Sequence, residues 1–177
     1  MKKLIKAADK IDDFIDWTGR VTSWLILALV VLIAIQVILR YTMSLGAVWA
    51  QELEWHLLAV IALCGVAYTQ KEDAHVRVDI LFQNFSKRTQ CLIELVTAVV
   101  VMAPLSLFIA WMALGFVMQS YNMGEISPDP GGLPYRFALK AFVIVGFVLL
   151  AIQSVAVALR NAAQFMNLGR GESHAAE

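Results

Sequence analysis

The stretch VTSWLILALVVLIAIQVIL occupies residues 21–39 and contains no charged residue. It begins after Arg20 and ends before Arg40. At the ~1.5 Å rise per residue of an α-helix it reaches roughly 28 Å, close to the ~30 Å hydrocarbon thickness of a bilayer. The stretch therefore predicts a transmembrane helix.

Three further apolar runs follow, at about residues 49–70, 95–121 and 137–159. The chain is 60% hydrophobic and 16% charged, with a mean hydropathy of +0.71. Soluble domains are about half apolar and about a quarter charged. Six aromatic residues lie towards the ends of the runs, where amphipathic rings favour the membrane interface: Trp24, Tyr41, Trp49, Trp55, Tyr68 and Tyr121. These features predict an all-α, four-helix integral membrane protein that forms a single membrane domain over residues 1–177.

The basic residues predict the orientation of the four spans. Eleven of the fourteen lysines and arginines lie before span one, between spans two and three, or after span four. Only Arg40, Arg136 and Lys140 lie on the other side. Because basic residues concentrate on the cytoplasmic side, we expect both termini in the cytoplasm, with residues 160–177 as a cytoplasmic tail.

Residues 1–20 carry an amphipathic pattern of their own. Leu4, Ala8, Ile11 and Ile15 recur at helical spacing among lysines and aspartates. One interpretation is a helix along the cytoplasmic interface, and the other is a helical extension of span one. The apolar run begins too late and is too long for a cleavable signal peptide, so none is expected.

The sequence contains little that suggests chemistry. Cys64 and Cys91 are expected on different levels of the bundle, so neither a disulfide nor a metal cluster is predicted. His56 is the one histidine near a span, which argues against a haem held by two histidines. Nucleotide, phosphate-loop and hydrolase motifs are absent from the sequence. We expect a protein that is not an enzyme and has no cofactor of its own.

Polar residues within membrane spans are costly and call for an explanation. Gln36 is interpreted as the polar residue well within a span, where it would form a hydrogen bond between helices. A second group lies near the outer ends of spans one, two and four, on the side opposite the cytoplasm: Arg40, Glu52, Glu54, His56 and Lys140. We expect an acid–base clasp of Arg40, Glu52, Glu54 and Lys140 that joins three helix ends. Interfacial snorkelling and ion or proton handling are the alternatives.

Two features bear on helix geometry. Pro104 lies inside span three and cannot donate to the carbonyl of Val100, which predicts a kink. Small residues on spans two and four could allow close approach to a partner helix; these are Ala59, Ala62, Gly65 and Gly146.

Two loops carry the strongest local patterns. The predicted cytoplasmic loop reads KEDAHVRVDILF over residues 71–82, with Arg77 and Asp79 alternating with apolar residues. It is either an interface segment or a docking site. The predicted outer loop reads GEISPDPGGLPYR over residues 124–136. Its glycines and prolines require a shaped turn, with Pro134 expected in the first turn of span four. The candidate contact residues of this loop are Pro128, Asp129, Pro130, Tyr135 and Arg136.

These patterns resemble a known family. The stretches WAQEL (residues 49–53), AHVRVD (74–79) and SPDPGGLPYR (127–136) are similar to the small membrane subunit, DctQ-type, of tripartite ATP-independent periplasmic (TRAP) transporters. The last stretch looks most like the branch labelled mannitol/chloroaromatic. The resemblance covers all four helices and both loops.

The resemblance implies a subunit of a three-part importer in the bacterial inner membrane. A periplasmic binding protein would capture an organic acid, and a large elevator-type membrane subunit would move it with a sodium gradient. The small subunit would act as a scaffold beside the large one. Sodium and substrate sites are expected in the large subunit, so no transport residue is assigned here. The expected partners are the large membrane subunit, the binding protein and membrane lipids, with no nucleic acid.

Two other classes of protein remain as alternatives. A homo-oligomeric channel or carrier would need a polar face through the membrane, and the spans offer only scattered polar residues. A membrane anchor of a redox enzyme is disfavoured by the shortage of histidines.

Overall fold

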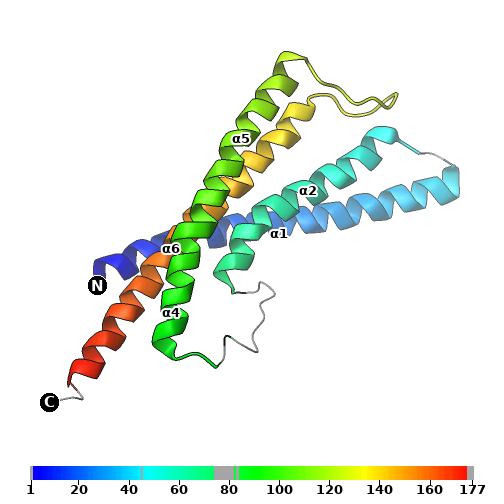
Figure 1. Cartoon of the computed structure of the whole chain (residues 1–177). Coiled ribbons are helices and arrows are strands. Elements are labelled where there is room, and N and C mark those ends of the chain that lie inside the picture. The colour runs from blue at the N-terminus through cyan, green and yellow to red at the C-terminus, as the bar shows by residue number, and fades with distance from the viewer. Residues whose placement is uncertain (1, 45, 74–81, 83, 175–177) are drawn as a thin grey trace.

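The computed structural model describes residues 2–44, 46–73, 82 and 84–174, and its regular elements are all helices (Figure 1). They are α1 (Lys2–Met43), α2 (Val48–Lys71), α4 (Lys87–Val96), the π-helix η1 (Thr97–Met102), α5 (Ala103–Asn122) and α6 (Arg136–His174). Four helical stretches are long and apolar enough to cross a membrane, with α4, η1 and α5 together forming the third. The four predicted spans are therefore confirmed as helices. Arg77 and Asp79 lie outside the described residues.

The helices form two hairpins with α6 at the centre. The first hairpin is α1–α2, and the second joins α4, η1 and α5 to α6. Helix α6 packs against each of the other helices. The turn between α1 and α2 and the loop at residues 123–135 lie at one end of the molecule, here called the loop end (Figure 1). Both ends of the described chain lie at the opposite, terminal end.

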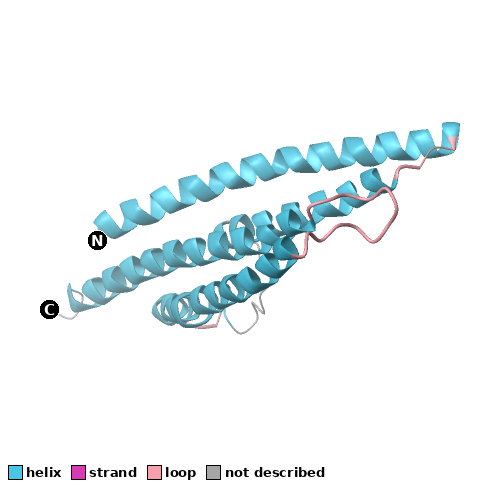
Figure 2. Ribbon diagram, turned by 90° about the horizontal axis from the view of Figure 1, so that it is seen from above, coloured by secondary structure: helices cyan, strands magenta, loops and turns pink. Residues whose placement is uncertain are grey.

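Residues 2–20 are part of one uninterrupted helix with the first span (Figure 2). Ala8 and Ile15 are fully buried, and Ile15 packs with Ala67 of α2 and Leu149 of α6. The apolar stripe of this segment therefore contacts protein, as expected for an extension of span one. Its placement along a membrane surface stays a prediction.

The outward face of α1 over residues 21–39 and most of α5 is apolar and exposed. Val30 and Ile38 on α1 are 57% and 60% exposed, and Trp111 on α5 is 68% exposed. Soluble folds are stabilised when apolar surface is removed from contact with water. These outward faces instead suit lipid or a partner helix, because none of the described residues covers them.

The third span is distorted just before Pro104. The six residues of η1 form a π-helix, and α5 begins with Pro104 in its first turn. Proline lacks the N–H that would bond to the carbonyl four residues earlier, so the preceding turn widens. Figure 1 shows the helix changing direction between α4 and α5, which agrees with the predicted kink.

Helices α2 and α6 approach closely at Gly146. A β-carbon built on Gly146 would lie 2.6 Å from the carbonyl oxygen of Leu63. A β-carbon on Gly65 would meet nothing within 4 Å. Gly146 therefore serves packing within the chain, while Gly65 remains a candidate point of contact with a partner.

Candidate functional site

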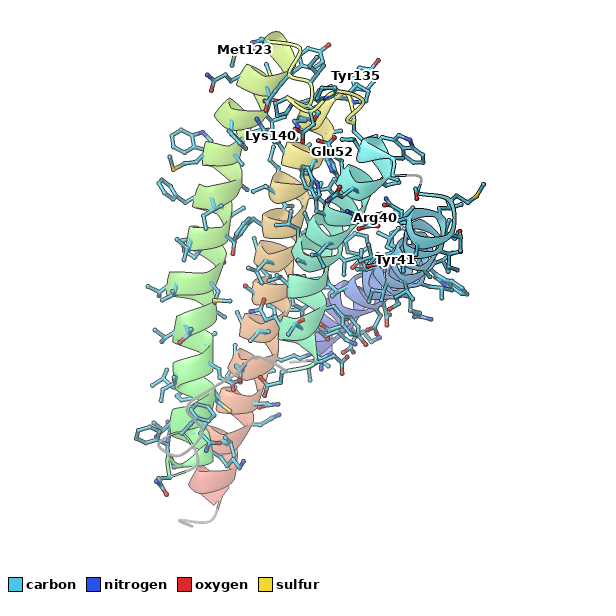
Figure 3. All side chains as sticks on the ribbon, turned by 90° about the vertical axis from the view of Figure 1, so that its right-hand side faces the viewer. Arg40, Tyr41, Glu52, Met123, Tyr135 and Lys140 are labelled. Carbon is cyan, nitrogen blue, oxygen red and sulfur yellow. The ribbon has the colours of Figure 1, made fainter. Side chains whose placement is uncertain are left out.

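The carboxylate of Glu52 is the centre of the loop end. Glu52 lies on the second turn of α2 and is 3% exposed. It accepts hydrogen bonds from the Ser127 hydroxyl and the Leu133 backbone N–H. Nη2 of Arg136 also donates to it at 3.2 Å, which adds an ion pair with the first residue of α6. One buried acid thus joins α2, the loop and α6, and Figure 3 shows Glu52 beneath this loop.

The loop that Glu52 holds has a compact shape of its own. The Ser127 N–H donates to the Leu133 carbonyl at 3.3 Å, and the Gly132 N–H donates to the Asp129 carbonyl at 3.0 Å. Gly131 has a φ of 82°, which a residue with a side chain rarely adopts. The turn predicted from its glycines and prolines is therefore present. Pro128, Asp129 and Pro130 are exposed at its tip, where the loop surrounds a hollow of about 430 Å³.

A second ion pair fastens the loop to α6. The Lys140 ammonium donates to the Glu125 carboxylate and lies 4.1 Å from the centre of the Phe116 ring of α5. This hydrogen bond from Lys140 holds the pKa of the Glu125 carboxyl below its ordinary value of 4.5. The Arg136 N–H donates to the Glu125 carbonyl at 3.3 Å. Glu125 therefore closes the base of the loop.

The predicted acid–base clasp exists with different partners. Glu52 forms an ion pair with Arg136, and Lys140 forms one with Glu125. The expectation that Glu52 and Lys140 belong to one ion-paired cluster is therefore wrong. Within the described residues, neither Arg40 nor Glu54 takes part in an ion pair. Arg136 begins α6 one turn before Lys140 and so reaches Glu52, while the loop supplies the second acid, Glu125. The sequence alone did not indicate how the loop folds back.

Two other candidate residues have local roles. His56 Nδ1 lies 2.6 Å from the carbonyl oxygen of Glu52 on the same helix. Tyr135 has a φ of 63° and is 68% exposed, and α6 begins only at the next residue. The expectation that Pro134 lies in the first turn of this helix is therefore wrong. The left-handed Tyr135 separates the loop from α6.

A second polar cluster at the terminal end was not expected from the sequence. The Gln153 amide donates to the buried Asp12 carboxylate at 3.0 Å, and Arg160 forms ion pairs with Asp12 and Asp9. These contacts join the first turns of α1 to α6. The Gln70 amide donates to the Ser154 hydroxyl at 3.3 Å and joins α2 to α6, while Lys71 of α2 forms an ion pair with Asp16.

This cluster corrects the view of Gln36 as the polar residue within the spans. Gln153 and Ser154 both lie inside the predicted fourth span and are at most 2% exposed. Two adjacent polar residues in an apolar run are a sequence pattern that indicates a polar contact within the bundle. Their partners on α1 could not be predicted, because the pattern of residues 1–20 fits both a helix along the membrane interface and an extension of span one.

The described residues contain no group of three or more histidine, cysteine or acidic side chains placed to hold a metal ion. Polar contacts gather at both ends of the bundle. These contacts have a structural role, because they hold the two helical hairpins and the loop at residues 123–135 in position against one another.

Comparison with known proteins gives two matches. The family described as "Tripartite ATP-independent periplasmic transporters, DctQ component" matches residues 29–164. A Haemophilus influenzae protein named as a TRAP transporter small permease is 27% identical over 126 residues, which cover 71% of this chain and 78% of that protein. The family match extends from the middle of α1 to beyond Arg160 of α6 and includes the whole loop end.

Proposed function

Since the chain belongs to the DctQ-component family of tripartite ATP-independent periplasmic transporters, we propose that it is the fixed supporting subunit of such a transporter. The family is a transporter component and not an enzyme, as expected from the sequence. In the proposed role the chain packs beside the large membrane subunit in the bacterial inner membrane, with both termini in the cytoplasm. The large subunit then moves an organic acid with a sodium gradient.

The observation that carries this proposal is the distribution of polar groups. Glu52, Glu125 and Asp12 are bonded within the chain, at one end of the bundle or the other. The outward faces of α1 and α5 between these ends are apolar. A carrier needs polar groups for its substrate near the middle of the membrane, commonly at broken helices. A support needs internal cohesion and an apolar face for its neighbour, which this arrangement provides.

Two outward faces are candidates for contact with the large subunit. Val30 represents the exposed face of α1, and Trp111 represents the exposed face of α5. A photo-crosslinking residue at either position, in cells that also express the large subunit, tests the contact. The proposal expects a crosslink to the large subunit from one face and lipid-only labelling from the other.

A pull-down tests the assembly itself. The tagged chain should co-purify with the large membrane subunit at a fixed ratio, and removal of its gene should abolish binding-protein-dependent uptake. Uptake that persists without the chain, or a chain that purifies alone and crosslinks only to itself, would overturn the proposal. Self-crosslinking would favour the homo-oligomeric alternative.

The loop end is proposed to meet the periplasmic binding protein. Asp129 is exposed at the loop tip and forms its hydrogen bonds with Ser127 and Gly132 through its backbone, so Asp129→Lys changes surface charge with little effect on the fold. We expect lower uptake with unchanged co-purification of the large subunit. Asp13→Lys is the matched control, because Asp13 is exposed at the terminal end. Equal uptake by both variants and the parent would exclude the loop tip as a docking surface.

A further inference from the structure

A polar cavity of about 450 Å³ lies between α1 and α2 at the loop end. It is separate from the site of Glu52 and is lined by Gln36, Arg40, Ser44, Gly46, Ala47, Val48 and Gln51. None of these residues is acidic. The lining instead offers a guanidinium, two amides and a hydroxyl, which makes the cavity a collection of hydrogen-bond donors around one positive charge.

The donors around this cavity lack partners in the described chain. Arg40 takes part in no ion pair there, and the amide nitrogen of Gln36 is buried without a hydrogen-bond partner. A buried polar nitrogen that stays unbonded costs about 1–3 kcal/mol, so such atoms normally have a partner. Ala47 precedes α2 and supplies no side-chain cap. The N–H groups of Ala50 and Gln51 donate to the Ala47 carbonyl, and those of Val48 and Trp49 are open towards an acceptor. Each of these features favours an anion.

The surroundings indicate where the anion comes from. The cavity lies where two membrane-length helices end, which is the level of lipid headgroups. Tyr41 and Trp49 beside it are 84% and 50% exposed, and Ile33, about one turn deeper than Gln36, is 40% exposed. Figure 3 shows Arg40 and Tyr41 on this side of the molecule. Interfacial aromatic rings and apolar helix surface suit acyl chains below a bound headgroup.

We propose that this cavity binds the phosphate of an anionic membrane phospholipid, with Arg40 as the charged contact and Gln36 as a hydrogen-bond donor. The lipid fills the gap that α1 and α2 leave between their ends and joins them as a third component. This assignment depends only on the chain being a membrane protein. It therefore stands or fails separately from the proposed role in transport.

Native mass spectrometry of the full chain tests the site, with nanodiscs of phosphatidylcholine containing one-fifth phosphatidylglycerol as the source of lipid. The parent chain should retain phosphatidylglycerol in preference to phosphatidylcholine. Arg40→Gln should lower that preference about fivefold, because one basic residue near anionic lipid contributes about a factor of that size. Arg40→Lys should keep most of it, and Gln36→Leu should lower it.

Arg20→Gln is the matched control, since Arg20 is an exposed arginine at the other end of the same apolar run. This variant should keep the preference of the parent. An equal loss in Arg20→Gln and Arg40→Gln would mean a general charge effect and would overturn the site. An unchanged preference in Arg40→Gln would overturn it as well and leave the cavity to water. A third arm adds inorganic phosphate at millimolar concentration without anionic lipid: protection of Arg40 from dicarbonyl labelling there, but not by phosphatidylglycerol, would reject a lipid source.

Discussion

A β-carbon built on Gly132 would lie 2.7 Å from Oε2 of Glu52, so the loop backbone and the carboxylate leave no room for another carbon. The same β-carbon would also collide with Ser127. The lack of space for a β-carbon therefore requires glycine at position 132. Backbone conformation does not require it, since the φ of Gly132 is not in the left-handed region. The buried acid and the glycine form a matched pair, one from α2 and one from the loop.

Gly132→Ala should destabilise the loop end. Overpacking of one methyl group costs about 1–3 kcal/mol. Thermal unfolding in detergent, followed by tryptophan fluorescence, measures the effect. Gly46→Ala is the control, since its β-carbon would meet nothing within 4 Å. Equal midpoints for the two variants would show that the loop shifts without cost.

Charge exchange distinguishes the observed ion pairs from the expected one. Glu125→Lys and Lys140→Glu should each lower thermal stability, and the double variant should recover part of the loss because the two side chains are in contact. Glu52→Lys combined with Lys140→Glu should recover nothing, because Glu52 pairs with Arg136. Recovery in the second combination would contradict the observed pairing.

The Glu125–Lys140 pair also predicts a dependence on pH. The folded pKa of Glu125 lies below 4.5, so folding favours its charged form. The stability from this pair is fully present above the unfolded pKa of 4.5 and is lost as the pH falls through the lower folded value. A series of unfolding midpoints between pH 7 and pH 3 measures it. Glu125→Gln should flatten the acidic limb of this curve, and an unaltered limb would assign the loss to other acids.

Gly146→Ala should force α2 and α6 apart, because the added carbon would lie 2.6 Å from the Leu63 carbonyl oxygen. Rigid backbone cannot give way as a side-chain tip can, so we expect a loss of about 1–3 kcal/mol in an SDS unfolding titration. Gly65→Ala has open space around it and should be neutral or stabilising by up to ~1 kcal/mol. A Gly146→Ala variant as stable as Gly65→Ala would show that the close approach is dispensable.

Asp12→Asn should loosen the first turns of α1. The change removes the charge that Arg160 contacts in a side chain that is 7% exposed. Loss of a hydrogen-bond partner in such a site costs about 1–3 kcal/mol. Faster amide exchange over residues 2–20 is the expected result. Asp13→Asn, at the exposed neighbouring position, should leave exchange unchanged.

The helices could be predicted because a membrane span is a local property of the sequence. The run at residues 21–39 needs no partner to be read as a helix, and the same is true of the other three. The partners of Glu52 could not be predicted in this way. They depend on how residues 124–136 fold back. The turns of this loop bring Ser127, Leu133 and Arg136 to one carboxylate, and the local sequence does not indicate where those turns place them in space.

The packing of residues 2–20 shows a different limit. Their amphipathic pattern is compatible with a membrane surface and with a protein surface, since both offer an apolar contact on one side. In the structure this segment contacts protein on its inner side, because Asp12 is buried against Gln153 and Arg160. Its position relative to a membrane surface stays a prediction. Charge on the inner face of a helix is thus evidence for a protein partner.

The central position of α6 has a consequence for biogenesis. Helix α6 leaves the ribosome after α1, α2, α4, η1 and α5, yet the third span makes its main contacts with it. The third span must therefore wait in the lipid, or beside the insertion machinery, until its neighbour is synthesised. Among the described helices, α1 and α2 can pair earlier, so the bundle closes late, when residues 136–174 contact both the α1–α2 hairpin and the third span.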